Sequence, residues 1–446
     1  MRPEPPDVRY ARSGDVSIAY ATVGAGDVDI VFVRGFAGDL ISAWEQPLLR
    51  RFIQDAAEFA RVTMLDKRGT GLSDRVREVP TLETRMDDLR AVMDDVGADD
   101  AVFWTAQEGA RLATLLAATY PERTRGLVLF DPTAKGRRTP DYPWALDDPE
   151  WRTRLREIRD GWGSTEFLDA RLVEWAPERS DDPEFRSWFL AHMRRGLSPG
   201  SALALFRMMM ESDVSDVLPA VRVPTVVLSS ATNRGPAQYF AERIPAARLV
   251  ELPVRSIYHW VDDESHAIAM RETRRLVEET QAEVVPDRVL ATMLFTDIVG
   301  STSRAAELGD SRWREVVAAH HSLVRAELRR FRGEEQDTAG DGFFATFDGP
   351  ARAIRCATEI VRAVRELGIE LRAGVHTGEC EVLDEKVGGI AVHIAARVAA
   401  EASTGEVLVS HTVKDLVAGS GIEFDDRGVA ELKGVPGEWR LFAVRV

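Results

Sequence analysis

The 446-residue sequence contains only two cysteines, Cys356 and Cys380. Their spacing matches no metal-binding or redox motif, so we expect two buried, reduced thiols. No stretch approaches the ~18 apolar residues of a membrane span. The opening residues, MRPEPPDVRY, lack both the basic start and the apolar core of a signal peptide. These absences predict a cytoplasmic protein without a membrane span.

Basic residues are also scarce: 57 lysines and arginines stand against 73 aspartates and glutamates, a formal net charge of −16. A surface that follows a phosphate backbone needs a basic stripe, so this balance argues against nucleic-acid binding. With 45% hydrophobic and 29% charged residues, the composition is that of a folded globular protein. The length exceeds one ordinary domain and predicts two, each able to bury a core.

The first part of the sequence alternates short apolar runs with helical patterns. This alternation predicts an α/β fold with a parallel sheet covered by helices on both faces. Residues 135–219 carry no strand signal and consist of polar, Trp-rich helical segments, which predicts a helical cap inserted on the sheet. The runs interpreted as buried strands are residues 29–36, 61–66, 100–106, 126–132 and 224–230.

A helix through residues 268–280 closes the first domain, which spans residues 1–280. The polar stretch 281–288, with Pro286 as its stop signal, is interpreted as a linker. The second domain, residues 289–446, has a mixed α+β pattern. Its expected elements include an apolar strand at 290–302, a long amphipathic helix at 313–331, a hairpin around 339–342 and a helix at 350–367.

Two aspartates in the second domain stand where a metal site needs carboxylates. Asp297 ends an apolar strand and is followed by a small-residue turn that opens a helix, while Asp341 lies at a glycine-flanked hairpin tip. Carboxylates on adjacent strand ends suit a pair of Mg²⁺ or Mn²⁺ ions, with triphosphate oxygens as further ligands. Backbone N–H groups at the helix start would face an anion. They belong to Val299, Gly300, Ser301 and Thr302.

Five segments of this domain resemble, in order and spacing, the class III adenylate/guanylate cyclase family. They are FTDIVGST, the AGDG hairpin, AGVHTGE (373–379), GIAVHIAARV (389–398) and ELKGVPGEWRLFAV (431–444). The resemblance covers residues 288–446. It implies a ferredoxin-like fold and the conversion of ATP to 3′,5′-cyclic AMP and pyrophosphate at a site shared between two copies of the chain.

Matched to the family's motifs, Asp297 and Asp341 are the two metal-binding aspartates of one protomer. Arg397 matches the arginine that stabilises the transition state, and Lys433 the lysine that holds the triphosphate; both would come from the other protomer. A homodimer would therefore carry two equivalent sites.

Three positions depart from the family pattern. His393 stands where the family has an asparagine, and it can still donate a hydrogen bond to the ribose. The base-reading lysine and aspartate of adenylate cyclases are replaced by Asp337 and Lys386, so the signs are exchanged. An aspartate can accept from adenine's amino group or from the N1–H and N2–H₂ edge of guanine. The alternative is that neither side chain reads the base and an apolar slot holds the purine. ATP is the default substrate and GTP its competitor.

Among the other histidines of this domain, His376 is interpreted as structural and the pair His320 and His321 is not expected to form a metal site. His376, in AGVHTGE, lies on an interior strand, away from the metal site. His320 and His321 are neighbours within a helix, where adjacent residues do not share a face, so they are not expected to bind a metal together.

Residues 8–280 resemble the α/β-hydrolase family. The resemblance rests on VFVRGFAGD (31–39), LDKRGTGLSD (65–74) and the strand–turn–helix segment FWTAQEGARLA (103–113). A fold does not by itself establish a function, so each position of the family's catalytic triad has to be compared with this sequence.

The triad positions carry unsuitable residues. Gln107 stands at the nucleophile, where an amide cannot accept an acyl group. Asn233 stands at the acid and Ile257 at the histidine, while His259 is displaced by two positions and could still face the pocket. Arg34 replaces the usual histidine before the oxyanion-hole glycine.

The domain is therefore interpreted as a pseudo-hydrolase. It would be either a sensor that binds a small acyl or carboxylate ligand on the backbone amides after Gly35 and Gln107, or a scaffold without a ligand. Two rival hypotheses remain for the chain. One is an active esterase fused to a cyclase, and the other is a degenerate cyclase domain that only binds nucleotide.

Overall fold

The computed structural model describes residues 4–36, 38–76, 80–280, 288–383 and 386–445, without the side chains of residues 339, 382, 383 and 386. The chain divides into two compact units, residues 1–286 and 287–446. The predicted linker, 281–288, lies outside the described residues except for Arg288, which begins a strand. No helix in the described ranges is both long and apolar enough to cross a membrane.

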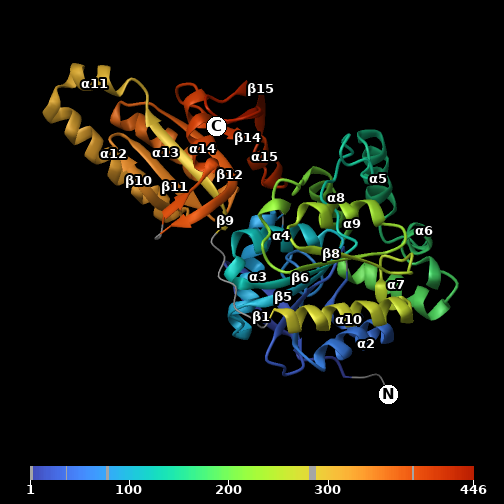
Figure 1. The fold of residues 1–446 in the computed structure, drawn as a ribbon. Coiled ribbons are helices and arrows are strands. Elements are labelled where there is room, and N and C mark those ends of the chain that lie inside the picture. Colours follow the sequence, from blue (N-terminus) through green and yellow to red (C-terminus); the bar gives the residue numbers. More distant parts are fainter. Residues whose placement is uncertain (1–3, 37, 77–79, 281–287, 384–385, 446) are drawn as a thin grey trace. The chain divides into compact units, whose positions relative to one another are not determined.

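The first unit is built on an eight-stranded sheet (Figure 1). Strand β2 is antiparallel to both of its neighbours, β1 and β4. All neighbouring strands from β4 to β8 run parallel to one another. The strand order is β1 (Arg9–Ser13), β2 (Val16–Val23), β4 (Arg61–Leu65), β3 (Asp29–Val33), β5 (Ala101–Ala106), β6 (Thr124–Phe130), β7 (Thr225–Ser229), β8 (Ala247–Glu251). The five strands expected from apolar runs are confirmed, and they form the buried centre of the sheet.

Helices cover both faces of this sheet, as the alternating pattern predicted. Helices α2 and α10 pack together on one face, and α3, α4 and α9 lie on the other (Figure 1). The helices are α1 (Leu40–Glu45), α2 (Pro47–Ala57), α3 (Leu82–Val96), α4 (Gly109–Thr119), α9 (Arg234–Arg243) and α10 (Asp263–Glu279). Four short 3₁₀ turns join the elements: η1 (Pro121–Arg123), η2 (Pro177–Arg179), η3 (Leu218–Ala220) and η4 (His259–Val261).

A helical cap follows β6 and precedes β7, within the predicted range 135–219. Each cap helix begins after an aspartate or serine whose side chain accepts a hydrogen bond from a first-turn backbone N–H. Such N-caps satisfy donors that have no partner inside the helix. The cap helices are α5 (Asp148–Gly161), α6 (Thr165–Trp175), α7 (Pro183–Gly196) and α8 (Pro199–Glu211).

The second unit has its own eight-stranded sheet, in which β9 lies between β11 and β12 and is antiparallel to both. A short strand, β13 (Lys386–Gly388), pairs with β12 at the side. The strand order is β10 (Glu334–Ala339), β11 (Gly342–Phe347), β9 (Arg288–Ile298), β12 (Leu371–Leu383), β14 (Val407–Ser410), β16 (Glu438–Val444), β15 (Phe424–Glu431).

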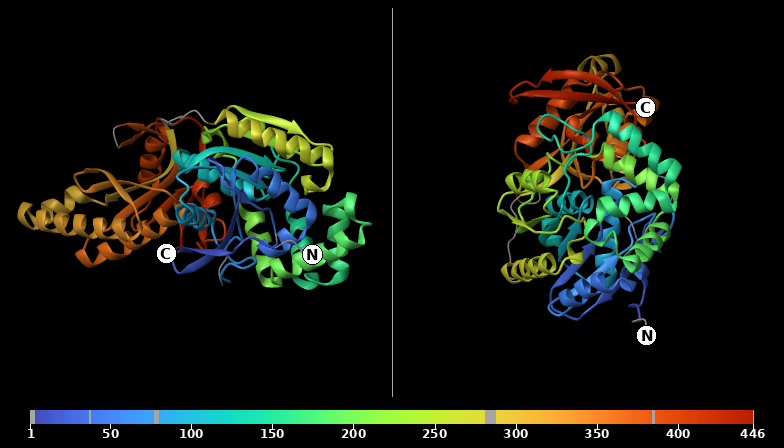
Figure 2. Two further views of the ribbon diagram at one scale, coloured as in Figure 1. Left: turned by 90° about the horizontal axis from the view of Figure 1, so that it is seen from below. Right: turned by 90° about the vertical axis from the view of Figure 1, so that its right-hand side faces the viewer.

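The two faces of this second sheet have different coverings. Alternation along β9 directs Leu294 into a core under α12 and α13, and Met293 toward α14 on the opposite face. Figure 2 shows α12 and α13 lying along one face of the sheet. The helices are α11 (Ser301–Leu308), α12 (Asp310–Arg330), α13 (Pro350–Ala363), α14 (Ile390–Glu401) and α15 (His411–Leu416), with the 3₁₀ turn η5 (Val364–Leu367) after α13.

Candidate functional site

The two predicted metal-binding aspartates lie at the same end of neighbouring strands. Thr296 of β9 pairs with Phe343 of β11, so Asp297 and the hairpin residue Asp341 are one or two positions beyond the same pair. The Oδ2 atom of Asp341 is buried and has no hydrogen-bond partner among the described atoms. A buried carboxylate oxygen without a partner is costly unless a cation or donor reaches it. The donor set therefore fits a hard divalent cation.

Asp297 has a partner that the sequence analysis missed. Arg372 of β12 is its register neighbour across the sheet. The Nη2 and Nε atoms of Arg372 lie 2.7 Å and 3.1 Å from Oδ2 of Asp297, and Nη1 donates to the carbonyl of Ala400 at 3.1 Å. Arg372 directly precedes the AGVHTGE motif, but its contact with Asp297 depends on the register between β9 and β12, which the sequence does not show.

The helix start beside Asp297 agrees only in part with the predicted anion site. Gly300 adopts a left-handed backbone (φ 68°) and starts α11, so the first-turn N–H groups of Ser301 and Thr302 have no acceptor within the helix. The prediction was wrong for Val299, whose N–H donates to the carbonyl of Glu370 at 2.9 Å. That bond continues the β9–β12 ladder by one residue and withdraws this donor from the anion.

A hollow of about 580 Å³ brings the helix start and one carboxylate together. Ser301 and Thr302 line it together with Asp341, and the side chains of Arg314 and His321 face it from α12. His321 Nε2 donates to the carbonyl of Gly340 at 3.1 Å, which braces the hairpin that carries Asp341.

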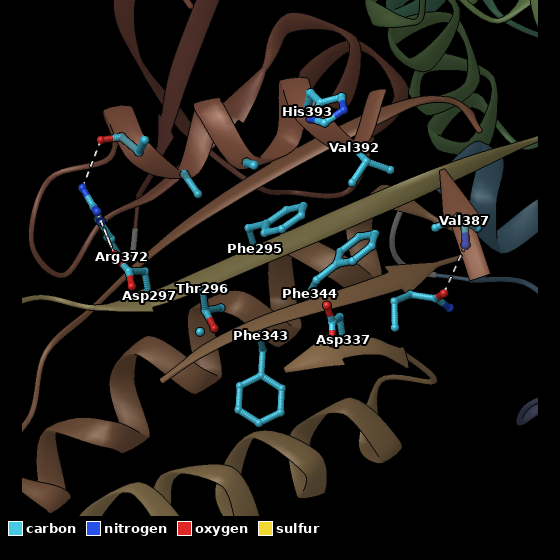
Figure 3. Close-up of a pocket in the computed structure, with 15 residues that line it drawn as sticks. Phe295, Thr296, Asp297, Asp337, Phe343, Phe344, Arg372, Val387, Val392 and His393 are labelled. Atoms are coloured by element: carbon cyan, nitrogen blue, oxygen red, sulfur yellow. Dashed lines mark hydrogen bonds and ion pairs between the residues drawn. The ribbon is translucent and has the colours of Figure 1, made fainter. Parts of the chain in front are cut away.

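A second hollow, of about 590 Å³, lies on the α14 side of the sheet (Figure 3). It brings Asp297, Asp337 and His393 together, and Arg372 joins them. Its floor is an aromatic pair, Phe295 and Phe344, whose rings are stacked with centroids 4.5 Å apart and planes 6° apart. Figure 3 shows Phe343, the next residue on β11, pointing to the opposite side of the sheet. The stacked rings give the hollow an apolar, aromatic floor.

Two further predicted residues, Arg397 and Lys433, lie outside both hollows. Arg397 is one turn beyond His393 on α14, and Lys433 lies in the turn between β15 and β16. Both side chains are exposed, and neither makes a hydrogen bond or ion pair within the described part of the chain. Lys386 begins β13, but its side chain lies outside the described residues.

His376 and His320 are both buried in the core of the second unit. His376 is buried on β12, with Nδ1 2.8 Å from the hydroxyl of Ser410. His320 is buried against Phe343, and burial lowers its pKa to about 4. No group of three or more His, Cys, Asp and Glu side chains in the described ranges is placed to hold a metal ion.

The two cysteines are both free and buried, as predicted. Burial raises the pKa of Cys356 and of Cys380 to about 12, so neither thiol is a nucleophile at neutral pH.

In the first unit, Gln107 occupies the turn between β5 and α4 with a left-handed backbone (φ 47°). This is the strained strand-to-helix turn on which the nucleophile of a hydrolase is carried. Its side-chain Nε2 donates to the carbonyl of Ile257 at 2.9 Å, and its Oε1 fills the space that a Cβ on Gly35 would need. Two triad positions thus meet through an amide–carbonyl hydrogen bond.

The third triad position does not join them. Asn233 precedes α9 and donates from Nδ2 to the carbonyl of Pro132 at 3.4 Å, away from the cavity that Gln107 and Ile257 line. His259 does line this cavity and is 1% exposed. Neither of its ring nitrogens has a hydrogen-bond partner among the described residues. Burial drives its pKa well below the usual range for histidine.

Comparison with known proteins matches each unit to a protein family. Residues 30–279, more than half of the chain, match the model described as "Alpha/beta hydrolase family". The chain belongs to the α/β-hydrolase family. Residues 287–445 match the model "Adenylate and Guanylate cyclase catalytic domain", so the second unit is a cyclase domain.

Individual relatives resemble one unit each. The receptor-type adenylate cyclase GRESAG 4.3 of Trypanosoma brucei brucei is 25% identical over 202 residues, which are 34% of this chain and only 16% of that protein. The 3-oxoadipate enol-lactonase 2 of Acinetobacter baylyi (strain ATCC 33305 / BD413 / ADP1) is 23% identical over 249 residues, 54% of this chain and 87% of the relative. The crystal structure of the enol-lactonase from Burkholderia xenovorans LB400 is 20% identical with a TM-score of 0.52, and covers 60% of this chain and 100% of its own. That likeness establishes the hydrolase fold alone.

Charged side chains near the turn that carries Gln107, between β5 and α4, form buried ion pairs. Lys67 pairs with Glu108, the residue after Gln107, and also donates to the carbonyl of Gly35. Arg34, at the position of the usual histidine, pairs with Asp66. Each buried charge is balanced by a partner, as low dielectric requires. The cationic side chains of Lys67 and Arg34 therefore already have carboxylate partners within the protein.

Proposed function

We propose that the cyclase domain converts a purine nucleoside triphosphate, by default ATP, to the 3′,5′-cyclic nucleotide and pyrophosphate. The observation that carries the proposal is the position of Asp297 and Asp341 at the same end of two neighbouring strands, beside the start of α11. Named adenylate cyclases among the relatives of this domain support the same reaction class.

Asp297 and Asp341 would hold two Mg²⁺ or Mn²⁺ ions. The buried Oδ2 of Asp341 without a partner fits this role. Bound there, the ions would neutralise the triphosphate and lower the pKa of the ribose 3′-hydroxyl. First-turn N–H groups of α11 would bind phosphate oxygens, as helix starts do.

Two of the remaining residues, Arg397 and Lys433, would act on the substrate from the second protomer of a homodimer. In the reaction, the 3′-oxygen forms a bond to the α-phosphorus while the bond to pyrophosphate breaks. Arg397 would stabilise the charge that develops on the phosphoryl group, Lys433 would hold the triphosphate and His393 would donate to the ribose. Arg397 and Lys433 are exposed and lie outside both hollows of their own chain, which supports a contribution across a dimer interface.

The α/β-hydrolase domain is proposed to be catalytically silent and to regulate the cyclase in response to a ligand. The amide of Gln107 fills the nucleophile position and bonds to the backbone of Ile257. Neither group can attack an ester or take up the proton of a nucleophile. The two free, buried thiols fit a reducing compartment, and we propose the cytoplasm.

GTP is the second candidate substrate, and Asp337 favours it. This carboxylate lines the hollow above Phe295 and Phe344 and can accept from both N1–H and N2–H₂ of guanine. If Asp337 reads the base, Asp337→Ala lowers kcat/KM for GTP by about tenfold or more and leaves that for ATP within about twofold. An unchanged kcat/KM for both substrates would mean that Asp337 does not read the base and that stacking holds it.

The experiment that tests the function is cyclic nucleotide formation by the purified full-length protein. ATP and GTP are supplied separately with Mn²⁺ or Mg²⁺. Asp297→Ala is expected to lose activity by about a hundredfold or more. The control is Asp310→Ala, an exposed aspartate at the start of α12, which should retain wild-type activity. Absence of product from both nucleotides, with the full-length protein and also with residues 288–446 expressed without the regulatory domain, would exclude the proposed reaction.

A further inference from the structure

We propose that the cavity of the α/β-hydrolase domain binds a neutral, phenol-sized molecule that carries one hydroxyl group, with His259 as its hydrogen-bonding partner. The inference extends the proposed ligand-responsive role of this domain by naming the ligand's chemistry. It does not depend on the cyclase reaction.

The size and lining of the cavity limit the ligand to a small apolar body. Its volume is about 230 Å³, below the ~300–1,000 Å³ typical of pockets for drug-sized ligands. Aromatic side chains enclose it from two sides. The sheet contributes Trp104 and Phe130, and the cap contributes Trp175, Trp188 and Phe206. Such walls favour a ring that packs edge-to-face or offset against them.

His259 lines the cavity and supplies a neutral polar group for a ligand. Its ring lies 4.7 Å from those of Phe52 and Trp104 and 5.2 Å from that of Phe130, measured between centroids. Both ring nitrogens are buried and make no hydrogen bond in the described part of the chain. A neutral imidazole has one donor and one acceptor nitrogen. A hydroxyl group can donate to the acceptor nitrogen or accept from the donor nitrogen, whichever tautomer is present. This bond would replace one that the ring would make with water if it were exposed.

The charges around the cavity argue against the carboxylate ligand that the sequence left open. Arg34 lines the cavity but is paired with Asp66, and Arg154 lines it but lies 3.3 Å from Glu174. Glu108, also in the lining, is held by Lys67. A carboxylate entering this apolar space would find no unpaired cation among these groups, so its desolvation would not be offset. A neutral ligand avoids that cost.

The test is isothermal titration of the full-length protein with three matched molecules: p-cresol, toluene and p-toluate. They share the ring and methyl group and differ in carrying a hydroxyl, nothing or a carboxylate. At pH 7.5 p-cresol is neutral, since a phenol has a pKa near 10. We expect p-cresol to bind one molecule per chain, about tenfold more tightly than toluene and p-toluate. Failure of p-cresol to bind, or tightest binding by p-toluate, would overturn the proposal.

Variants locate the interaction within the cavity. His259→Phe keeps a ring at this position and removes both nitrogens. It should weaken the binding of p-cresol to the level seen with toluene and leave the affinity for toluene unchanged. Ala106→Leu, which fills the cavity from β5, should abolish binding of both. His320→Phe, in the cyclase domain, is the control and should change neither. Equal binding of p-cresol by wild type and His259→Phe would contradict the proposal even if the cyclase is active. The comparison among ligands on the wild-type protein stands should a variant fail to fold.

Discussion

Arg372 holds Asp297 through two donors on one oxygen: its Nη2 and Nε atoms lie 2.7 Å and 3.1 Å from the carboxylate Oδ2. Both side chains are more than a third exposed. Within one chain, the guanidinium of Arg372 therefore binds the carboxylate that we propose as a metal ligand. A cation that binds Asp297 has to displace or share this contact.

Arg372→Ala should lower the metal concentration needed for half-maximal activity. An exposed ion pair of this kind is worth ~0.2–1 kcal/mol, so removal of the competing guanidinium corresponds to a change of at most about fivefold. The measurement is a Mn²⁺ titration of cyclic nucleotide formation, read as the half-saturating concentration and separately from the maximal rate. Arg325→Ala is the matched control, because Arg325 pairs with Glu335 on the neighbouring hairpin. An unchanged or higher metal requirement in Arg372→Ala would contradict the competition.

His320 should make the stability of the cyclase domain depend on pH. Its pKa is about 4 in the folded domain because it is buried, and ~6.5 when unfolded. Between these values the unfolded chain binds a proton that the folded domain does not. The stability contributed by the neutral ring is therefore complete above pH ~6.5 and is lost as the pH falls toward 4, by up to ~1.4 kcal/mol per pH unit.

Hydrogen exchange of peptides from α12 checks this expectation. Corrected for intrinsic rates, the opening free energy of the wild type should fall between pH 7 and pH 5. His320→Phe, which retains a ring against Phe343, should remove most of that difference. His321→Phe, at the neighbouring half-buried position, should keep it. The idea is wrong if His320→Phe and the wild type show the same dependence.

The sequence was sufficient for the fold where burial dominates. The central strands β3 to β7 are continuous apolar runs, and they were predicted within a few residues. Strands β1, β2 and β8 were missed: β1 and β8 form the edges of the sheet, and the residues of β8 are only partly buried. A short edge strand is set by pairing with its neighbour more than by its own pattern.

For the site, the sequence was reliable about residue types and less so about their partners. Asp297 and Asp341 lie at the same end of neighbouring strands, β9 and β11, and their binding of metal stays a prediction. The contact of Arg372 with Asp297 depends on the register between strands 75 positions apart, which composition and spacing do not encode. Val299 was wrongly assigned to the anion site because the length of the β9–β12 ladder is not visible in the sequence.

Gln107→Ser should not create an esterase. Serine at this turn would have a hydroxyl, but Asn233 lies outside the cavity and Ile257 offers no imidazole. Among the described residues, no carboxylate bonds to His259 to orient its ring. Turnover of p-nitrophenyl acetate by Gln107→Ser, by Gln107→Ala and by the wild type should therefore be equal and at the level of the buffer. A rate that serine raises tenfold over alanine would show that a working base remains near this turn.

The most direct test of the central claim, a cyclase site shared between two chains, uses two inactive variants. Asp297→Ala removes a metal-binding carboxylate and Arg397→Ala removes the transition-state arginine, so each homodimer should lose at least about a hundredfold in activity. A heterodimer of the two, co-expressed with different affinity tags and purified through both, would carry one intact site and one doubly defective site. The predicted result is about half of the wild-type rate of cyclic nucleotide formation per dimer. A heterodimer as inactive as its parents would contradict the shared site.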